Sequence, residues 1–97
     1  MIKVIVKKDT IKISGHALYD EFGKDIVCAA VSSSVLTTIN AILSINPSSI
    51  KVDEGNDLII SIVKKDDTVD ILLNNMINML KEIENDYKKN IKVIKED

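Results

Sequence analysis

Apolar and polar residues alternate over two short segments at the start of the chain, residues 2–7 and 10–14, and most of the polar positions are lysine. A period of two is typical of a strand that buries one face. Lys8 and Asp9 separate the two segments and predict a short hairpin connection. The chain is therefore expected to begin with an antiparallel pair of strands.

A second pair of strands is predicted in the middle of the chain, at residues 50–54 and 57–63. Gly55 and Asn56 form the predicted turn between them, because a positive φ is easily tolerated there. The run from Leu58 to Val63 is almost wholly apolar. That run favours a central strand of the sheet.

The last third of the chain has the spacing of an amphipathic helix followed by a short strand, Ile91 to Ile94. Asp67 is the predicted N-cap of this helix. Lys88 and Lys89 are expected in its last turn, where positive charge suits the helix dipole. Its apolar positions, spaced by three and four, are Val69, Leu72, Leu73, Met76, Leu80, Ile83 and Tyr87.

An earlier helix is predicted at about residues 26–44, with the sequence IVCAAVSSSVLTTINAILS, and it contains no charged residue. A helix that is apolar or small all round is buried all round. The sheet of so small a domain covers only one side. We therefore expect the second helix or a partner subunit to cover much of the other side. Pro47, after Asn46, ends the helix.

These elements give the order ββαββαβ, an α+β fold with a largely antiparallel sheet. Ninety-seven residues are enough for one hydrophobic core, so residues 1–97 are expected to form a single domain. Hydrophobic residues make up 45% and charged residues 29% of the chain, which is ordinary for a soluble globular protein.

The composition disfavours several classes of function. The 13 basic residues are all lysine, the net charge is −2, and there are only three aromatic residues, so direct nucleic-acid binding is not expected. One cysteine and one histidine are too few for a structural zinc site, and three glycines are too few for a Gly-rich phosphate loop. No cofactor is expected.

The single cysteine excludes an internal disulfide. No segment resembles a signal peptide or an apolar run of membrane-spanning length. The expected location is therefore the cytosol, without membrane attachment.

The candidate chemistry lies in residues 15–32. Gly15 lets the chain turn sharply at the end of a strand, and His16 follows it. After a loop at 17–24, Asp25 is a good N-cap that places Cys28 in the first helical turn. The positive end of a helix stabilises a thiolate, so we expect a solvent-reachable sulfur close to the His16 imidazole.

Each of these residues also has a purely structural interpretation. A lone cysteine in an apolar helix is more often an inert core residue than a nucleophile. Ser32, one turn after Cys28, can simply pack against a neighbouring element. Tyr19 and Phe22 in the loop can form a hydrophobic cover over the core. The functional interpretation gains weight because the only His and the only Cys flank one loop.

The stretch GHA, five further residues and then GKDIVCAAVS resembles the signature of the ribosomal-processing cysteine protease family, also described as YsxB-like proteins. The match is dense around His16 and from Asp25 to Ser32. Length and element order also suit that family. The loop carries Asp20 and Glu21, whose charges bear on substrate preference.

The resemblance implies a bacterial cytosolic cysteine endopeptidase that removes a short N-terminal extension from the precursor of a large-subunit ribosomal protein. His16 and Cys28 would be the catalytic pair. Asp25 and Ser32 would support the site or contact substrate, with Gly15, Tyr19 and Phe22 beside them. Family members are homodimers, which agrees with the uncharged helix.

Three other interpretations remain open from the residues alone. A non-enzymatic module that docks on the ribosome would not need Cys28. A thiol redox sensor would use Cys28 without cleaving any peptide. A purely structural protein built on a buried-helix dimer would be indifferent to loss of His16.

Overall fold

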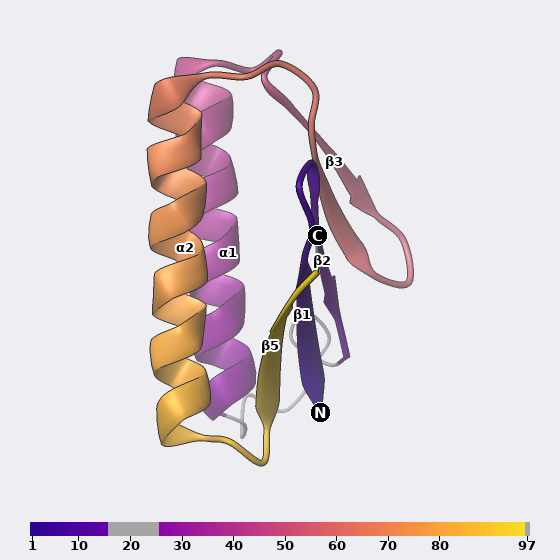
Figure 1. Cartoon of the computed structure of the whole chain (residues 1–97), viewed down its shortest axis with the longest axis vertical. Helices are drawn as coiled ribbons and strands as arrows, with labels where there is room; N and C mark the ends of the chain where they lie inside the picture. The colour runs from indigo at the N-terminus through magenta and orange to yellow at the C-terminus, as the bar shows by residue number, and fades with distance from the viewer. Residues whose placement is uncertain (16–25, 97) are drawn as a thin grey trace.

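Two helices lie side by side over one face of a five-stranded sheet (Figure 1). The computed structural model describes residues 1–15 and 26–96. Its elements are β1 (Ile2–Val6), β2 (Thr10–Ser14), α1 (Ile26–Ile45), β3 (Ile50–Glu54), β4 (Leu58–Ile62), α2 (Asp67–Asp86) and β5 (Ile91–Lys95). This order confirms the predicted ββαββαβ arrangement, and most boundaries agree with the sequence pattern to within one residue.

The strands are arranged in the order β3-β4-β2-β1-β5. Three of the neighbouring pairs are antiparallel, and only β1 and β5 run parallel. The sheet is therefore mixed, with the antiparallel majority that was expected. The apolar strand β4 has neighbours on both sides, as predicted for Leu58–Val63.

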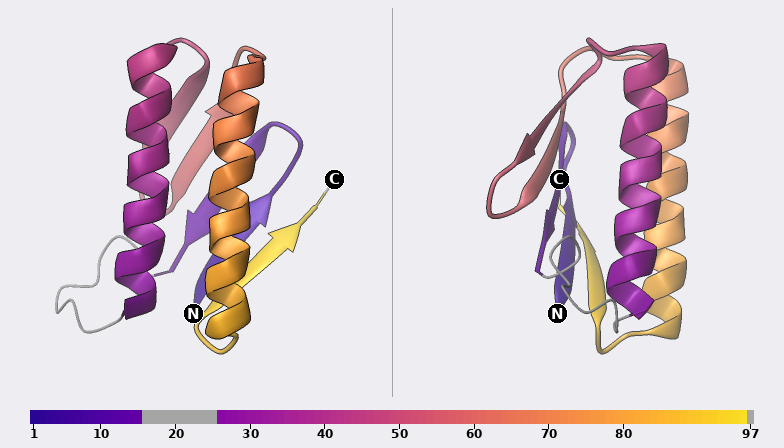
Figure 2. Two further views of the ribbon diagram at one scale, coloured as in Figure 1. Left: turned by 90° about the vertical axis from the view of Figure 1, so that its left-hand side faces the viewer. Right: turned by 180° about the vertical axis from the view of Figure 1, so that it is seen from behind.

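The hydrophobic core lies between the helices and one face of the sheet, and it follows from the period of two in the strands. In β1, Ile2, Val4 and Val6 are buried, whereas Lys3 is exposed on the opposite face. From the helices, the fully buried side chains include Val31, Val35, Ile42, Met76 and Leu80. Figure 2 shows the two layers from behind, with the outer face of the sheet left uncovered by helices.

The uncharged helix α1 is covered on two sides, by the sheet and by α2. A third side remains exposed. Its residues follow one another at intervals of three and four, and they are Ile26, Ala29, Ser33, Leu36, Asn40 and Leu43. We call this set the α1 stripe. Ile26 is 69% exposed and Leu36 is 40% exposed, so the expected burial of α1 is only partly met within one chain.

By length and composition alone, α1 is apolar enough to cross a membrane. This corrects the expectation that no segment of the chain has that character. The packing of α1 explains its composition, because Val27, Val31, Val35 and Ile42 are all buried in the core. In this fold α1 is a core helix.

The start of α2 differs from the prediction by one residue. Asp66, not Asp67, is the N-cap, and its Oδ1 accepts hydrogen bonds from the N–H groups of Thr68 (2.8 Å) and Val69 (3.2 Å). Its Oδ2 accepts a 2.7 Å bond from the side-chain amide of Asn46, just after α1. The bond from Asn46, followed by the bond from Val69, lowers the pKa of Asp66 below its usual 3.8. Asp66 thus joins the end of α1 to the beginning of α2.

One smaller expectation was wrong. Lys88 and Lys89 lie beyond the end of α2, because Tyr87 is the C-cap and its N–H donates a hydrogen bond to the carbonyl of Ile83. The predicted turn at Gly55 and Asn56 is confirmed, although Gly55 does not use a positive φ. Among residues 1–15 and 26–96, only Gly15 has one.

Candidate active site

Gly15 fixes how the chain leaves the sheet. Its φ is +104°, in the region that L side chains rarely adopt. A Cβ at this position would lie 2.6 Å from the carbonyl oxygen of Met1 and 3.0 Å from the Cα of Ile2. Only glycine therefore lets the end of β2 pass so close to the beginning of β1. The contact thus fixes the backbone at Gly15, the last described residue before His16 in the sequence.

Cys28 is the third residue of α1 and lies in its first turn, as predicted. The N–H groups of a first turn point toward the helix N-terminus, where the helix dipole is positive. No acidic residue occurs at positions 26–29, but Asp25 directly precedes them and a carboxylate close to the sulfur opposes that field. The helix N-terminus by itself favours a thiolate.

The side chain of Cys28 is buried, with 4% of its surface exposed, which differs from the expected solvent-reachable sulfur. It belongs to the same core cluster as Val27 and Val31. The difference has a physical reason. The first turn of α1 already packs into the core, so a residue at the helix start is not automatically at the surface.

Ser32 lies one helical turn after Cys28 and is half-buried. Residues four apart occupy the same face of a helix, so Ser32 shares the face of the cysteine. Residues His16, Tyr19, Phe22 and Asp25 lie outside the described residues. The end of β2 and the first turns of α1 lie at the same end of the molecule (Figure 2).

No site for a metal ion is formed by the described parts of the chain, where no three His, Cys, Asp or Glu side chains come together. The close approach of Gly15 to the carbonyl oxygen of Met1 was not predicted from the sequence. A glycine followed by histidine indicates a turn, but only the strand register shows which backbone atoms it meets.

Comparison with known proteins places this chemistry in a family. The family model described as "Cysteine protease Prp" matches residues 1–92. The ribosomal processing cysteine protease Prp of Mycoplasma genitalium is 35% identical over 100 aligned positions, covering 99% of this chain and 97% of the relative. The protein of the same name from Staphylococcus aureus is 33% identical over 85 positions, covering 84% and 80%.

Solved structures agree with the sequence relatives. The crystal structure of an essential ribosomal processing protease Prp from S. aureus, in complex with a covalently linked product peptide, superposes with a TM-score of 0.89. The identity is 27%, with 99% of this chain and 100% of that chain covered. The S. aureus protease in complex with a substrate peptide gives a TM-score of 0.86 at 26% identity. The family model, the sequence relatives and the fold agree, and the chain belongs to the Prp family of cysteine proteases.

Proposed function

We propose that this protein is an endopeptidase that removes an N-terminal extension from the precursor of a large-subunit ribosomal protein. The observation that carries the proposal is the position of Cys28 in the first turn of an uncharged helix. The names of the relatives from S. aureus and M. genitalium, and the peptides bound to the S. aureus protease, support it.

In the proposed reaction, His16 removes the proton from the Cys28 thiol and the sulfur attacks the carbonyl carbon of the scissile peptide bond. Backbone N–H groups at the start of α1 stabilise the negative oxygen that forms. His16 then returns its proton to the leaving amine as the C–N bond breaks. Water hydrolyses the thioester, which releases the N-terminal extension and restores the thiol. The reaction needs no cofactor.

The burial of Cys28 adds a step to this proposal. Because only 4% of its side chain is exposed, substrate binding is coupled to a local opening around the first turn of α1. Such coupling has a benefit: a buried thiol is protected from oxidation and from alternative substrates until the correct peptide is in place.

The remaining residues of the site have supporting roles. Asp25 caps α1 or orients the second nitrogen of His16, and Ser32 supports the site from the next turn of the helix. Tyr19 and Phe22 contribute an apolar surface for a substrate side chain. Gly15 has a backbone role, because its contact with Met1 leaves no space for a side chain.

We further propose that the active form is a cytosolic homodimer in which the α1 stripe of one chain packs against that of a second copy. Spacings of three and four, repeated over the whole helix, are those of a helix–helix contact. The stripe contains no charge, and its Ala29 and Ser33 are small enough for close approach of another helix.

The experiment that tests the proposed function is incubation of the purified chain with the full-length ribosomal precursor, followed by mass spectrometry of the intact products. The proposal predicts two fragments whose masses add up to the precursor plus one water. An intact precursor in the presence of folded protein would contradict it. Trapping of a sulfenic acid at Cys28 without any cleavage would instead indicate a redox sensor.

A further inference from the structure

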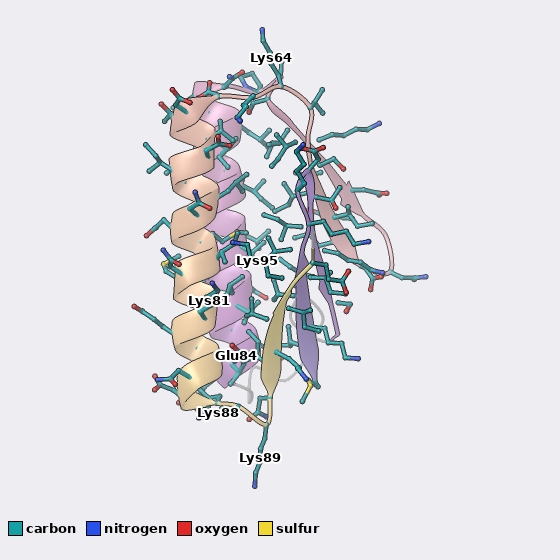
Figure 3. All side chains as sticks on the ribbon, in the orientation of Figure 1. Lys64, Lys81, Glu84, Lys88, Lys89 and Lys95 are labelled. Carbon is teal, nitrogen blue, oxygen red and sulfur yellow. The ribbon has the colours of Figure 1, made fainter. Side chains whose placement is uncertain are left out.

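Lys88 and Lys89 lie at the end of the molecule where α2 leads into β5, and Lys81 lies further along α2 from that end (Figure 3). Lys81, Lys88 and Lys92 line a shallow hollow of about 470 Å³, together with Met1, Glu84 and Asn85. Lys89 is next to Lys88 in the connection between α2 and β5, and Lys3 is the register partner of Lys92 on β1. We call the set Lys3, Lys81, Lys88, Lys89 and Lys92 the α2–β5 lysine surface.

The charges of this surface are poorly compensated. Over residues 1–15 and 26–96 there are two ion pairs, and they use other lysines, Lys7 with Glu96 and Lys12 with Asp57. Glu84 is the only carboxylate that lines the hollow, and its Oε2 already accepts a 2.9 Å hydrogen bond from the N–H of Val93. Three lysines therefore line the hollow with one carboxylate, in a chain whose net charge is −2.

Lys3 and Lys92 are one place where two positive charges of this surface lie close together. They are directly opposite each other on the parallel strands β1 and β5, and both side chains are exposed. Like charges in directly opposed positions destabilise a sheet. An anion bound between them would remove that repulsion.

The chemistry of the surface favours one kind of anion. Protein-binding sites usually have an apolar centre with aromatic residues and Arg, whereas the hollow contains no aromatic side chain and Met1 is its one large apolar residue. Phosphate groups on a nucleic-acid backbone need only well-spaced positive charges, which Lys supplies as a point charge. Lys81 lies on α2, Lys88 in the connection that follows it and Lys92 on β5, so the positive charges come from three successive parts of the chain.

We propose that the α2–β5 lysine surface binds the phosphate backbone of RNA, without sequence preference. The choice of RNA over other phosphate polymers rests on the proposed ribosomal function, whereas the electrostatic binding does not. The net charge of the whole chain, −2, argued against such a partner because it does not show how the charges are distributed over the surface. An RNA strand bound to the α2–β5 lysine surface would lie at the same end of the molecule as the first turn of α1 (Figures 1 and 2).

The test is fluorescence anisotropy of a labelled oligouridine of about 20 nucleotides, titrated with the full chain between about 50 and about 200 mM salt. About four phosphate contacts give a salt slope of about −3, so binding weakens about 50-fold over that range. The double substitution Lys88→Gln and Lys92→Gln should reduce the slope to about −1.5 and weaken binding about tenfold or more at the lower salt.

The matched control is Lys51→Gln with Lys64→Gln, which changes the net charge equally at exposed positions away from the hollow. The control should bind within about twofold of the native chain. A second pair, Lys81→Gln with Lys89→Gln, repeats the test if the first variant has a lower unfolding temperature.

Three results would overturn the proposal: no binding at the lower salt, equal losses in the control and the patch variants, or an unchanged salt slope. Competition by an oligoglutamate of equal charge that matches RNA would also reject it and indicate an acidic protein partner. The assay uses no substrate peptide, so its failure is separate from failure of the proposed protease function.

Discussion

A side chain at position 15 would lie 2.6 Å from the carbonyl oxygen of Met1, so Gly15 and Met1 are held in a contact that only glycine permits. The contact links the end of β2 to the beginning of β1. It lies one residue before His16 in the sequence, the proposed partner of Cys28.

Replacing Gly15 with Ala should therefore reduce both stability and activity. The positive φ and the close contact with Met1 together predict a loss of about 1–3 kcal/mol in the free energy of unfolding. Gly55→Ala is the matched control, because a Cβ there meets nothing within 4 Å and the φ is not positive. Urea unfolding of both variants checks the difference. Equal free energies of unfolding for the two variants would show that the contact with Met1 does not restrict the residue at position 15.

Removal of the Asp66 carboxylate should loosen the junction between α1 and α2. Asp66→Ala loses the cap of α2 and the bond from Asn46, so we expect a lower midpoint of thermal unfolding than in Asp53→Asn, an exposed control on β3. The pKa of Asp66 is lowered in the folded state. Its contribution is therefore complete above about pH 4 and is lost as the pH falls through the lowered pKa.

That pH dependence can be measured directly. The native chain should lose more stability than Asp66→Ala when the pH is lowered below about 4, because only the native chain must protonate this carboxylate. Thermal unfolding at several pH values gives the comparison. Parallel curves for the two proteins would mean that Asp66 makes no pH-dependent contribution.

The α1 stripe should be the dimer contact. Leu36→Lys introduces a charge at the middle of the stripe, so sedimentation velocity should show a monomer with unchanged secondary structure. Ile71→Lys is the matched control, because Ile71 is 68% exposed on α2 and is not part of the stripe. The control should remain dimeric. A native chain that sediments as a monomer at micromolar concentration would contradict the proposed dimer.

Cys28 should react slowly with iodoacetamide in the native chain, because its side chain is 4% exposed. The rate should nevertheless rise with pH with a midpoint below about 8.5, the value for an ordinary thiol, since the first turn of a helix favours the thiolate. The same chain unfolded in urea provides the reference. A native midpoint at or above that of the unfolded chain would indicate an inert core cysteine.

The strand and helix order could be predicted because it follows from periodicity. Alternation in residues 2–7 identifies the buried face of β1, and spacings of three and four identify α2. The N-cap could not be assigned as surely, because Asp66 and Asp67 are consecutive and either can cap. Asn46, which binds Asp66, is twenty positions earlier in the chain, so only the tertiary structure shows the choice.

Part of the candidate site could also be predicted from the sequence pattern. A helix that begins after the loop places Cys28 in the first turn, as the structure confirms. Its burial could not be predicted, because it depends on how α1 settles against the sheet. The pairing of Lys3 with Lys92 was also hidden, since it requires the parallel register of β1 and β5.

The most direct test of the central claim is the rate at which Cys28→Ala and Cys28→Ser cleave the ribosomal precursor, compared with the native chain. Asn75→Ala, an exposed substitution on α2 outside the site and the α1 stripe, is the control and should retain native activity. If the sulfur of Cys28 is the nucleophile, both cysteine variants should be folded and about a thousandfold or more slower. Cleavage by folded Cys28→Ala at the native rate would show that another group performs the reaction.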